Sequence, residues 1–472
     1  MPRLLIAGLS GGSGKTVVTM GLLLLLRRAG IEARAFKKGP DYIDPAWLTW
    51  ASGYPARNLD AFLMGTDTVR ASFAKYAVHD GVNVIEGNRG LFDGVDAAGT
   101  YSSAALAESL NAPIVLVLDA TKMTRTAAAL VLGCQTIDPK AAIRGVILNN
   151  VNGRRHEDVL RESIESTCSV PILGSLPRLE DNPLPERHLG LVPPEEHDGT
   201  DAMERRLAEW MKDRVDLDAL LAMARGAGQV EVRAGDRRRL PDARGLRIGY
   251  LRDAAFNFYY PENLEELERA GADLVSVSVL DAAKLPEGLH ALYIGGGFPE
   301  THAREIAANG SFLESLRRAC TGGLPVYAEC GGLMLLARSL SWKGNSYRMA
   351  DVLPVDVEAC ARPQGHGYCE LRVDTENPFF AAGKHLRGHE FHYSRITEGP
   401  AKVNSACAVM RGTGCFAKRD GLLIHNVMAV YAHLHALATP EWAQGMITAA
   451  RAFELMTDSR GHTPESKSAP TA

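Results

Sequence analysis

A single cysteine lies between an apolar run and two glycines in the stretch PVYAECGGLMLLA, residues 325–337. An apolar strand that stops abruptly, followed by Cys-Gly-Gly and an amphipathic segment, is typical of a nucleophile elbow. Cys330 would stand at the tip of that turn, and the start of the following helix would favour its thiolate form. A buried core cysteine is the alternative interpretation, because most lone cysteines are inert packing residues.

Two further features of the same half of the chain would complete an acyl-transfer site. A thiol nucleophile needs a base at the end of a neighbouring strand, and the segment VMAVYAHLHAL offers His433 and His435. The run ALYIGGGFPE leaves an apolar segment into three glycines, whose N–H groups could face an oxyanion. Taken alone, either histidine could be structural and the glycines a tight turn. Together they predict an oxyanion site formed by Gly296, Gly297 and Gly331.

The opening stretch, RLLIAGLSGGSGKTVVTMGLLLLL, runs from an apolar strand through a glycine-rich turn into Gly-Lys-Thr and a helix. In such a loop the backbone N–H groups cradle phosphate oxygens, the lysine neutralises the outer phosphates and the threonine hydroxyl ligates Mg²⁺. The loop is a variant, because Gly8 stands one place earlier than the strict pattern requires. A merely structural turn is the alternative. The predicted phosphate-binding residues are Gly12, Ser13, Gly14, Lys15 and Thr16.

Carboxylates follow two of the predicted strands near this loop in sequence. A nucleotide site needs such groups at the carboxyl ends of neighbouring strands to complete the metal sphere. The segment AFKKGPDYIDP presents Asp41 and Asp44, and VNVIEGNRGLFDG presents Glu86 and, further on, Asp93. Acidic residues in turns are often solvated groups or helix caps. Four of them beside a Gly-Lys-Thr loop favour metal and phosphate chemistry.

Apolar runs of strand length alternate with helical patterns along both halves of the 472-residue chain. Strands without polar alternation favour a parallel sheet covered by helices, and the length favours two domains. We predict an α/β fold with a P-loop-type parallel-sheet domain at residues 1–227 and a linker at 228–244. A second α/β domain with a mixed sheet follows at 245–450. Residues 451–472 are polar and without period, which predicts a disordered tail.

The composition excludes several classes of protein. A net charge of −4 provides no broad basic surface, so we expect no nucleic-acid partner. No apolar run approaches the length of a membrane span, and the N-terminus lacks a signal-peptide layout, so we expect a cytoplasmic protein without a membrane partner. The eight cysteines form no CxxC pair, and neither a zinc site nor a disulfide framework is indicated.

The two groups of motifs together resemble the cobyrinate a,c-diamide synthase family over roughly residues 3–445. The resemblance rests on SGGSGKT, KKGPDYIDP, NLDAFLM, EGNRGLFDG, PERHLGLV, FYYPENLEELERAGADL, IGGGFPE, YAECGGLM, GHEFHYSR and YAHLH. It implies an ATP-dependent amide ligase domain like dethiobiotin synthetase, followed by a class I glutamine amidotransferase-like domain. Cys330 would attack the glutamine amide, with His433 as the base. The position two residues later, acidic in many class I amidotransferases, is His435, so a third triad member is not assigned.

In the first domain the resemblance implies that ATP and Mg²⁺ activate an acetate carboxylate of a tetrapyrrole, cobyrinate by default, as an acyl phosphate. Ammonia from glutamine would then form the amide, and a direct passage between the domains would keep it neutral and concentrated. A homodimer is also implied. Roles with ATP and metal fall to Lys15, Thr16, Asp41 and Glu86, and substrate contacts to Tyr42, Asp44 and Asp93.

Departures from the family pattern leave the tetrapyrrole open. Trp47 and Leu48 replace the usual aromatic and histidine, and Asn88 and Arg89 replace an apolar pair. These positions are expected near the macrocycle, so sirohydrochlorin, its nickel form or siroheme are alternative substrates. A more distant alternative is a P-loop ATPase that carries an inactive amidotransferase domain. It predicts that Cys330→Ala leaves function intact.

Overall fold

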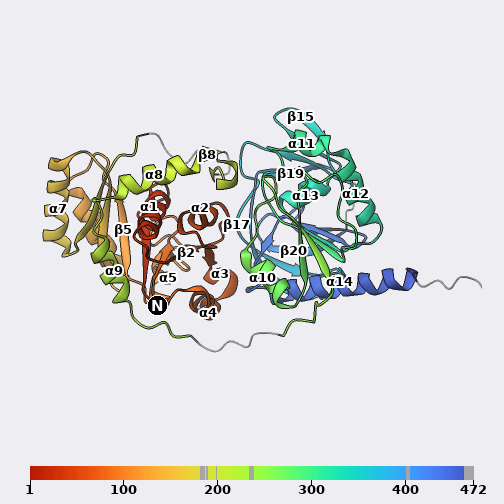
Figure 1. Ribbon diagram of the computed structural model, residues 1–472, viewed down its shortest axis with the longest axis horizontal. Helices are drawn as coiled ribbons and strands as arrows, with labels where there is room; N and C mark the ends of the chain where they lie inside the picture. The colour runs from red at the N-terminus through yellow and green to blue at the C-terminus, as the bar shows by residue number, and fades with distance from the viewer. Residues whose placement is uncertain (181–185, 188–189, 198, 233–238, 400–403, 462–472) are drawn as a thin grey trace, which may run out of the picture. The chain divides into compact units, whose positions relative to one another are not determined.

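The chain forms two compact units, Met1–Asp236 and Arg237–Ala472, in a computed structural model (Figure 1). The division falls inside the predicted linker, residues 228–244. The structure describes residues 1–472 except 181–185, 188–189, 198, 233–238, 400–403 and 462–472.

The first unit is built on a seven-stranded sheet. Its strands are β1 (Arg3–Gly8), β2 (Ala33–Lys38), β3 (Arg57–Leu59), β4 (Val82–Glu86), β5 (Ile114–Asp119), β6 (Ile143–Val151) and β7 (Ile172–Pro177). Its helices are α1 (Lys15–Arg28), α2 (Ile43–Ser52), α3 (Ala61–Met64), α4 (Thr66–Tyr76), α5 (Ser103–Ser109), α6 (Thr126–Ile137), α7 (Arg154–Cys168), α8 (Thr200–Met211) and α9 (Leu217–Arg225). A short pair of strands, β8 (Glu186–Arg187) and β9 (Gly190–Leu191), and a 3₁₀ helix, η1 (Pro194–Glu196), complete the described elements.

The seven strands run in the order β3-β2-β4-β1-β5-β6-β7 and pair in parallel throughout. Helices cover both faces, which explains why the strands are apolar without alternation. On one face α1 packs against α2 and α8 (Figure 1). On the other face Phe36 of β2 meets Phe73 of α4, with ring centroids 5.0 Å apart. The carboxyl ends of β1, β2 and β4 therefore meet at one edge of the sheet, where the predicted phosphate loop and carboxylates begin.

The second unit contains a ten-stranded mixed sheet and a smaller four-stranded sheet. Its strands are β10 (Arg247–Leu251), β11 (Asp273–Val277), β12 (Ala291–Ile294), β13 (Val326–Glu329), β14 (Ser339–Trp342), β15 (Asn345–Arg348), β16 (Asp356–Ala359), β17 (Gly365–Val373), β18 (His385–His392), β19 (Ser394–Glu398), β20 (Ser405–Arg411), β21 (Arg419–Ile424), β22 (Val427–Val430) and β23 (His433–Leu434). Its helices are α10 (Pro261–Arg269), α11 (Ala303–Ala308), α12 (Gly310–Thr321), α13 (Gly331–Leu336) and α14 (Pro440–Gly461).

The large sheet has the order β11-β10-β12-β13-β22-β21-β20-β17-β18-β23. The strands from β11 to β22 are parallel and the rest antiparallel, as the change from continuous to alternating apolar runs predicts. One apolar core contains residues of α11, α12 and α13, and another contains residues of α10 and α14. Strands β12, β13 and β22 are neighbours, so the segments that follow them lie together.

The predicted disordered tail is wrong in its first part. Helix α14 continues through Gly461, and Arg451 Nη2 donates hydrogen bonds to the carbonyl oxygens of Asp242, at 3.2 Å, and Arg244, at 2.9 Å. The polar sequence after residue 450 misled the prediction, because it forms the exposed end of a helix whose beginning is anchored in the core. Residues 462–472 lie outside the described part of the chain. Among the described helices, none is long and apolar enough to cross a membrane.

Candidate active sites

The glycine-rich loop between β1 and α1 has the conformation of a candidate phosphate-binding cradle. Gly12 and Gly14 have φ values of 74° and 85°, a left-handed conformation that glycine adopts without strain. The side chain of Lys15 is 7% exposed and lies back across the loop. Its Nζ donates to the carbonyl oxygen of Ser10 at 2.8 Å and lies 3.4 Å from Ser13 Oγ. Lysine and backbone N–H groups are thus held where nucleotide phosphates would bind.

Gly8, which stands one place earlier than in the strict pattern, and Asn149, which lies outside the motif, both help to fix the conformation of this loop. A Cβ atom on Gly8 would lie 2.2 Å from Ser13 Oγ, which explains why the glycine falls there and the loop departs from the strict pattern. Asn149, near the end of β6, donates from Nδ2 to the carbonyl oxygen of Ser13 at 3.1 Å. The sequence analysis missed Asn149. The polar pair Asn149–Asn150 after an apolar strand was the available signal.

Behind the loop, a buried charge network joins the carboxylates predicted from the sequence. Thr16 Oγ1 donates to Glu86 Oε1 at 2.9 Å. Lys37 Nζ lies 2.6 Å from the same oxygen and 2.5 Å from Asp44 Oδ2. Asp41 Oδ1 accepts the N–H of Asp44 at 3.0 Å and so caps the start of α2. Lys37 was not predicted as a site residue, although it lies at the end of a strand beside the motif.

Burial and neighbouring charges shift the acid–base properties of this network. Burial, reinforced by Asp44, raises the pKa of Asp41 to about 7. Burial also raises the pKa of Glu86, although Lys37 partly offsets the effect. Burial alone would lower the pKa of Lys37, but Asp44 and Glu86 hold it above its ordinary value. The pKa of Lys15 is lowered by burial and then by Lys37. Lys15 and Lys37 therefore lie among buried carboxylates, as a site for polyphosphate and metal requires.

The predicted substrate residues have different positions in the structure. Tyr42 precedes α2 as its N-cap, and Asp44 belongs to the charge network through Lys37. Asp93 Oδ2 accepts the N–H of Gly90 at 2.8 Å, so its carboxylate helps to shape the turn after β4. The turn is fixed to the end of β1 by a hydrogen bond from Leu91 N–H to the Gly8 carbonyl oxygen, 2.8 Å long. The turn therefore lies beside the phosphate loop.

Two of the departures that suggested another tetrapyrrole are core residues. Trp47 and Leu48 are both fully buried, and Trp47 Nε1 donates to the carbonyl oxygen of Val192 at 3.0 Å. They were expected near the macrocycle, and the structure places both side chains in the core of the first unit. Their identity reflects packing of α2 against the core. Asn88 is half-buried and Arg89 exposed, so only this second pair could face a substrate.

Cys330 occupies a strained turn between β13 and α13. Its backbone has φ 48° and ψ −96°, an unusual conformation for a residue other than glycine. Its N–H donates to the carbonyl oxygen of Val430 at 2.7 Å, which fixes the turn to β22. Burial, followed by the charge of Glu300, raises the pKa of the thiol far above its ordinary value. The N–H of Gly331 at the start of α13 lowers this pKa, as expected, but burial outweighs the effect, so the thiol needs a base.

The base and the glycine turn predicted from the sequence adjoin each other, and the turn lies beside Gly331, the residue after this cysteine. A Cβ atom on Gly296 would lie 2.7 Å from His433 Cε1, and a Cβ atom on Gly331 would lie 3.1 Å from the Gly297 nitrogen. The imidazole, the glycine turn and the residue after Cys330 therefore adjoin one another. Glycines are required there because side chains would fill the space. The arrangement can place a carbonyl group between a thiol, an imidazole and backbone N–H groups.

The structure separates the roles of the two candidate histidines. His435 Nε2 lies 3.6 Å from Glu262 Oε2, and both side chains are fully buried. His433 instead contacts the glycine turn, and its Nδ1 lies 3.3 Å from Glu329 Oε2. Of the two histidines, His433 is thus the candidate base for Cys330. The sequence analysis missed Glu329, which lies directly before the cysteine in the same motif.

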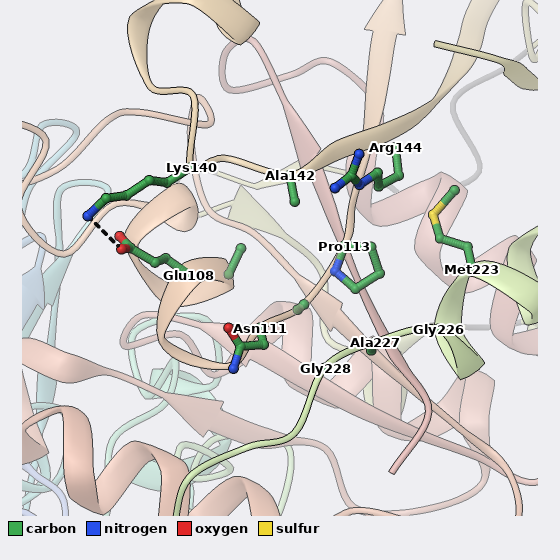
Figure 2. A pocket seen from close by; sticks show the side chains of 12 residues that line it. Glu108, Asn111, Pro113, Lys140, Ala142, Arg144, Met223, Gly226, Ala227 and Gly228 are labelled. Carbon is green, nitrogen blue, oxygen red and sulfur yellow. Dashed lines mark hydrogen bonds and ion pairs between the residues drawn. The ribbon is translucent and has the colours of Figure 1, made fainter.

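A cavity of about 570 Å³ in the first unit lies away from these residues. Pro113 and Ala142, which line it, precede β5 and β6, so the cavity is at the amino ends of the strands (Figure 2). Lys140 reaches across to Glu108, with 3.0 Å between Nζ and Oε1. None of the predicted site residues lines it. Ligands of parallel sheets bind at the carboxyl ends, so the cavity is not the phosphate site.

Comparison with known proteins matches both units. A family model described as a CobQ/CobB/MinD/ParA nucleotide binding domain matches residues 4–192, and one described as a CobB/CobQ-like glutamine amidotransferase domain matches residues 247–441. The cobyrinate a,c-diamide synthase of Magnetococcus marinus is 42% identical over 448 residues, which cover 94% of this chain and 96% of that protein.

Two further relatives with the same name are nearly as similar. The synthase of Caldanaerobacter subterraneus is 37% identical over 95% of this chain and 98% of that protein. The synthase of Salmonella typhimurium is 38% identical over 95% of this chain and 98% of that protein. The chain therefore belongs to the cobyrinate a,c-diamide synthase family of ATP- and glutamine-dependent amide ligases.

Proposed function

We propose that the protein amidates the a and c acetate carboxylates of cobyrinate, using ATP to activate each carboxylate and glutamine to supply ammonia. One observation carries this proposal. A lysine-covered phosphate loop with a buried carboxylate network and a cysteine–histidine site with a glycine turn occur in the two units of one chain. The names of the relatives supply the substrate.

The first unit would activate the carboxylate. A carboxylate is a poor electrophile, so its phosphorylation to an acyl phosphate prepares it for attack by ammonia. Negative charge on the transferred phosphoryl group needs compensation, since positioning and electrostatics supply most of the catalysis of phosphoryl transfer. Lys15, folded over the loop, and Lys37, held between Asp44 and Glu86, are two cations of this chain that could supply it.

The residues behind the phosphate loop fit Mg²⁺ as part of an ATP complex. Glu86 Oε2 is buried and has no hydrogen-bond partner among the described residues, and Glu86 Oε1 adjoins the hydroxyl of Thr16. No group of three or more acidic, histidine or cysteine side chains could hold a metal by itself in the described part of the chain. Mg²⁺ commonly binds one or two protein groups and substrate phosphates. We assign Thr16 and Glu86 as ligands, with Asp41 in the same network, and bound Mg²⁺ would neutralise phosphate charge.

The second unit would release the ammonia. His433 takes the proton from the Cys330 thiol, and the sulfur attacks the carboxamide carbon of glutamine. The N–H groups at Gly296, Gly297 and Gly331 would stabilise the oxyanion. As the C–N bond breaks, the imidazolium of His433 returns the proton to the leaving nitrogen, which gives a glutamyl thioester and ammonia. Water then hydrolyses the thioester and restores the thiol.

The test of the substrate is direct. Purified protein is incubated with Mg·ATP, glutamine and either cobyrinate or siroheme, and the products are separated by charge, because each amide removes one negative charge. We expect cobyrinate to be converted into a species with two charges fewer, and siroheme to remain unchanged. Amidated siroheme beside unchanged cobyrinate would overturn the substrate assignment. Light scattering of the same sample tests the homodimer that we propose for this chain.

Replacement of Gly296 by alanine should reduce glutamine hydrolysis strongly. The new Cβ atom would lie 2.7 Å from His433 Cε1, so the imidazole or the glycine turn must move. We expect kcat for glutaminase activity to fall by about a hundredfold, comparable with the loss of one oxyanion donor. Gly310→Ala is the matched control, because a Cβ atom there meets nothing within 4 Å. Equal loss in both variants, or none in Gly296→Ala, would contradict this geometry.

Binding of Mg·ATP should release a proton near neutral pH. The pKa of Asp41 is raised to about 7 by burial and Asp44, so the carboxyl group is partly protonated at that pH. A bound cation favours the ionised form, and the apparent affinity for Mg²⁺ should therefore weaken as pH falls through about 7. Calorimetry in buffers of different ionisation enthalpy measures the released proton. The release should disappear in Asp41→Asn, and identical release in both proteins would contradict the assignment.

A further inference from the structure

The cysteine–histidine site contains a buried carboxylate directly before the nucleophile in the chain. Glu329 is the last residue of β13, and its side chain is fully buried. Its Oε2 lies 3.3 Å from His433 Nδ1, and its Oε1 accepts the N–H of Leu434 at 3.2 Å. The carboxylate thus contacts both the ring of His433 and the backbone immediately after it.

A polar chain anchors this carboxylate from its other side. The hydroxyl of Tyr293 donates to Glu329 Oε2 at 3.1 Å. Burial, followed by the charge of Glu329, raises the pKa of Tyr293 well above its ordinary value, so the hydroxyl stays protonated and can donate. Asn263 Nδ2 donates to the Tyr293 hydroxyl at 3.2 Å and to the Leu434 carbonyl oxygen at 2.9 Å. The rotamer of Glu329 is therefore fixed by groups on β12, α10 and β23.

A fixed carboxylate at Nδ1 selects one tautomer of the imidazole. Nδ1–H must donate to Glu329, which leaves Nε2 without a proton. Nε2 is the nitrogen of His433 near the glycine turn, since it would lie 3.4 Å from a Cβ atom on Gly296. A base that takes the proton of the buried Cys330 thiol must have this form. The same carboxylate would stabilise the imidazolium that results.

We propose that Glu329 is the positioning residue that completes the Cys330–His433 site. His435 does not position His433, because its ring lies against Glu262 and its Nδ1 accepts the N–H of Leu437 at 3.2 Å. The charged partner of the base therefore precedes the nucleophile on β13. This inference rests on the proposed glutaminase role of Cys330 and His433.

Glu329→Gln is the variant that tests the tautomer. The carboxamide oxygen can keep the hydrogen bond from Leu434 N–H, and its NH₂ group then faces His433 Nδ1. Nδ1 must accept, so the ring proton moves to Nε2 and the imidazole can no longer act as the base. Loss of the correct tautomer in a serine–histidine–aspartate site lowers kcat about 10⁴-fold. We expect a fall in glutaminase kcat of at least a hundredfold with an unchanged KM for glutamine, because Glu329 does not reach the substrate.

A double-mutant cycle separates positioning from structural support. The rate of Cys330 alkylation by iodoacetamide is measured in wild type, Glu329→Gln, His433→Ala and the double variant. We expect the double variant to equal His433→Ala, because a carboxylate that acts through the imidazole has no effect once the imidazole is gone. Additive losses, or wild-type kcat in Glu329→Gln, would overturn the proposal.

Two controls keep this result interpretable. Amidation with added ammonium salt should remain at the wild-type rate in Glu329→Gln, and its thermal unfolding should match that of Glu287→Gln, which changes an exposed carboxylate of the same unit. If Glu329→Gln does not fold, Glu329→Asp is used to test the proposal, because its shorter side chain keeps the negative charge but moves the carboxylate away from His433 Nδ1. Its kcat should fall with KM constant, and an unchanged kcat would overturn the proposal. Retained glutaminase activity in Cys330→Ala would instead refute the proposed function itself.

Discussion

Cys330→Ala should abolish amidation with glutamine and leave amidation with ammonium salt at the wild-type rate. The thiol stands at the strained turn directly before Gly331, which adjoins the glycine turn that His433 contacts, and it is the nucleophile that we propose for the thioester. Loss of a covalent nucleophile is among the largest single effects in catalysis, so we expect glutaminase activity to fall by at least about a thousandfold. Release of glutamate measures the first activity, and the amidated tetrapyrrole measures the second.

Cys320→Ala is the matched control for this variant. Cys320 is fully buried in the same apolar core and burial raises the pKa of its thiol to about 12, but it lies on α12 away from the glycine turn. It should keep both activities. A Cys330→Ala protein that still uses glutamine would contradict the account and would favour a P-loop ATPase with an inactive amidotransferase domain.

Lys15→Met should abolish amidation but leave the hydrolysis of glutamine intact, the reverse of the effect of Cys330→Ala. The variant keeps the length of the side chain but removes the charge that lies over the phosphate loop. We expect amidation with either nitrogen source to fall by at least about a thousandfold, because charge compensation supplies much of phosphoryl-transfer catalysis. Basal hydrolysis of glutamine should persist. Release of glutamate and formation of the amidated product provide the two measurements.

A lysine elsewhere in the first unit controls for loss of charge alone. Lys140 is 73% exposed and pairs with Glu108 at the other edge of the sheet. Lys140→Met should retain both activities. Wild-type amidation by Lys15→Met, or an equal loss in Lys140→Met, would contradict the assignment of the phosphate loop.

The sequence predicted the features that local patterns determine. Continuous apolar strands indicated the parallel sheets, and Gly-Lys-Thr and Cys-Gly-Gly follow β1 and β13, at the strand ends where the candidate sites were expected. In each case the motif fixes its own geometry: Gly14 needs a left-handed backbone, and Cys330 marks the end of β13. The mixed sheet of the second unit also followed from the change in apolar period.

Features that depend on distant partners were not predictable in this way. In the sequence Lys37 is an ordinary lysine at the end of a strand. The pairing of β2 with β4 places it next to Glu86. Glu329 becomes a partner of His433 only through the pairing of β13 with β22. Trp47 was expected near the macrocycle because of the motif that contains it, but α2 packs its side chain into the core. The sequence gives the residue types at each strand end, whereas the strand order decides which of them meet.

The isotope content of the phosphate produced during amidation tests the central claim most directly. Cobyrinate with ¹⁸O in its carboxylates is incubated with Mg·ATP and glutamine labelled with ¹⁵N in the amide. The account predicts that each ¹⁵N incorporated into the tetrapyrrole is accompanied by one ¹⁸O in inorganic phosphate. When ammonia displaces phosphate from the acyl phosphate, the released phosphate carries one oxygen of the original carboxylate. ¹⁵N-amide formed without ¹⁸O in phosphate, or with ¹⁸O in AMP, would contradict it.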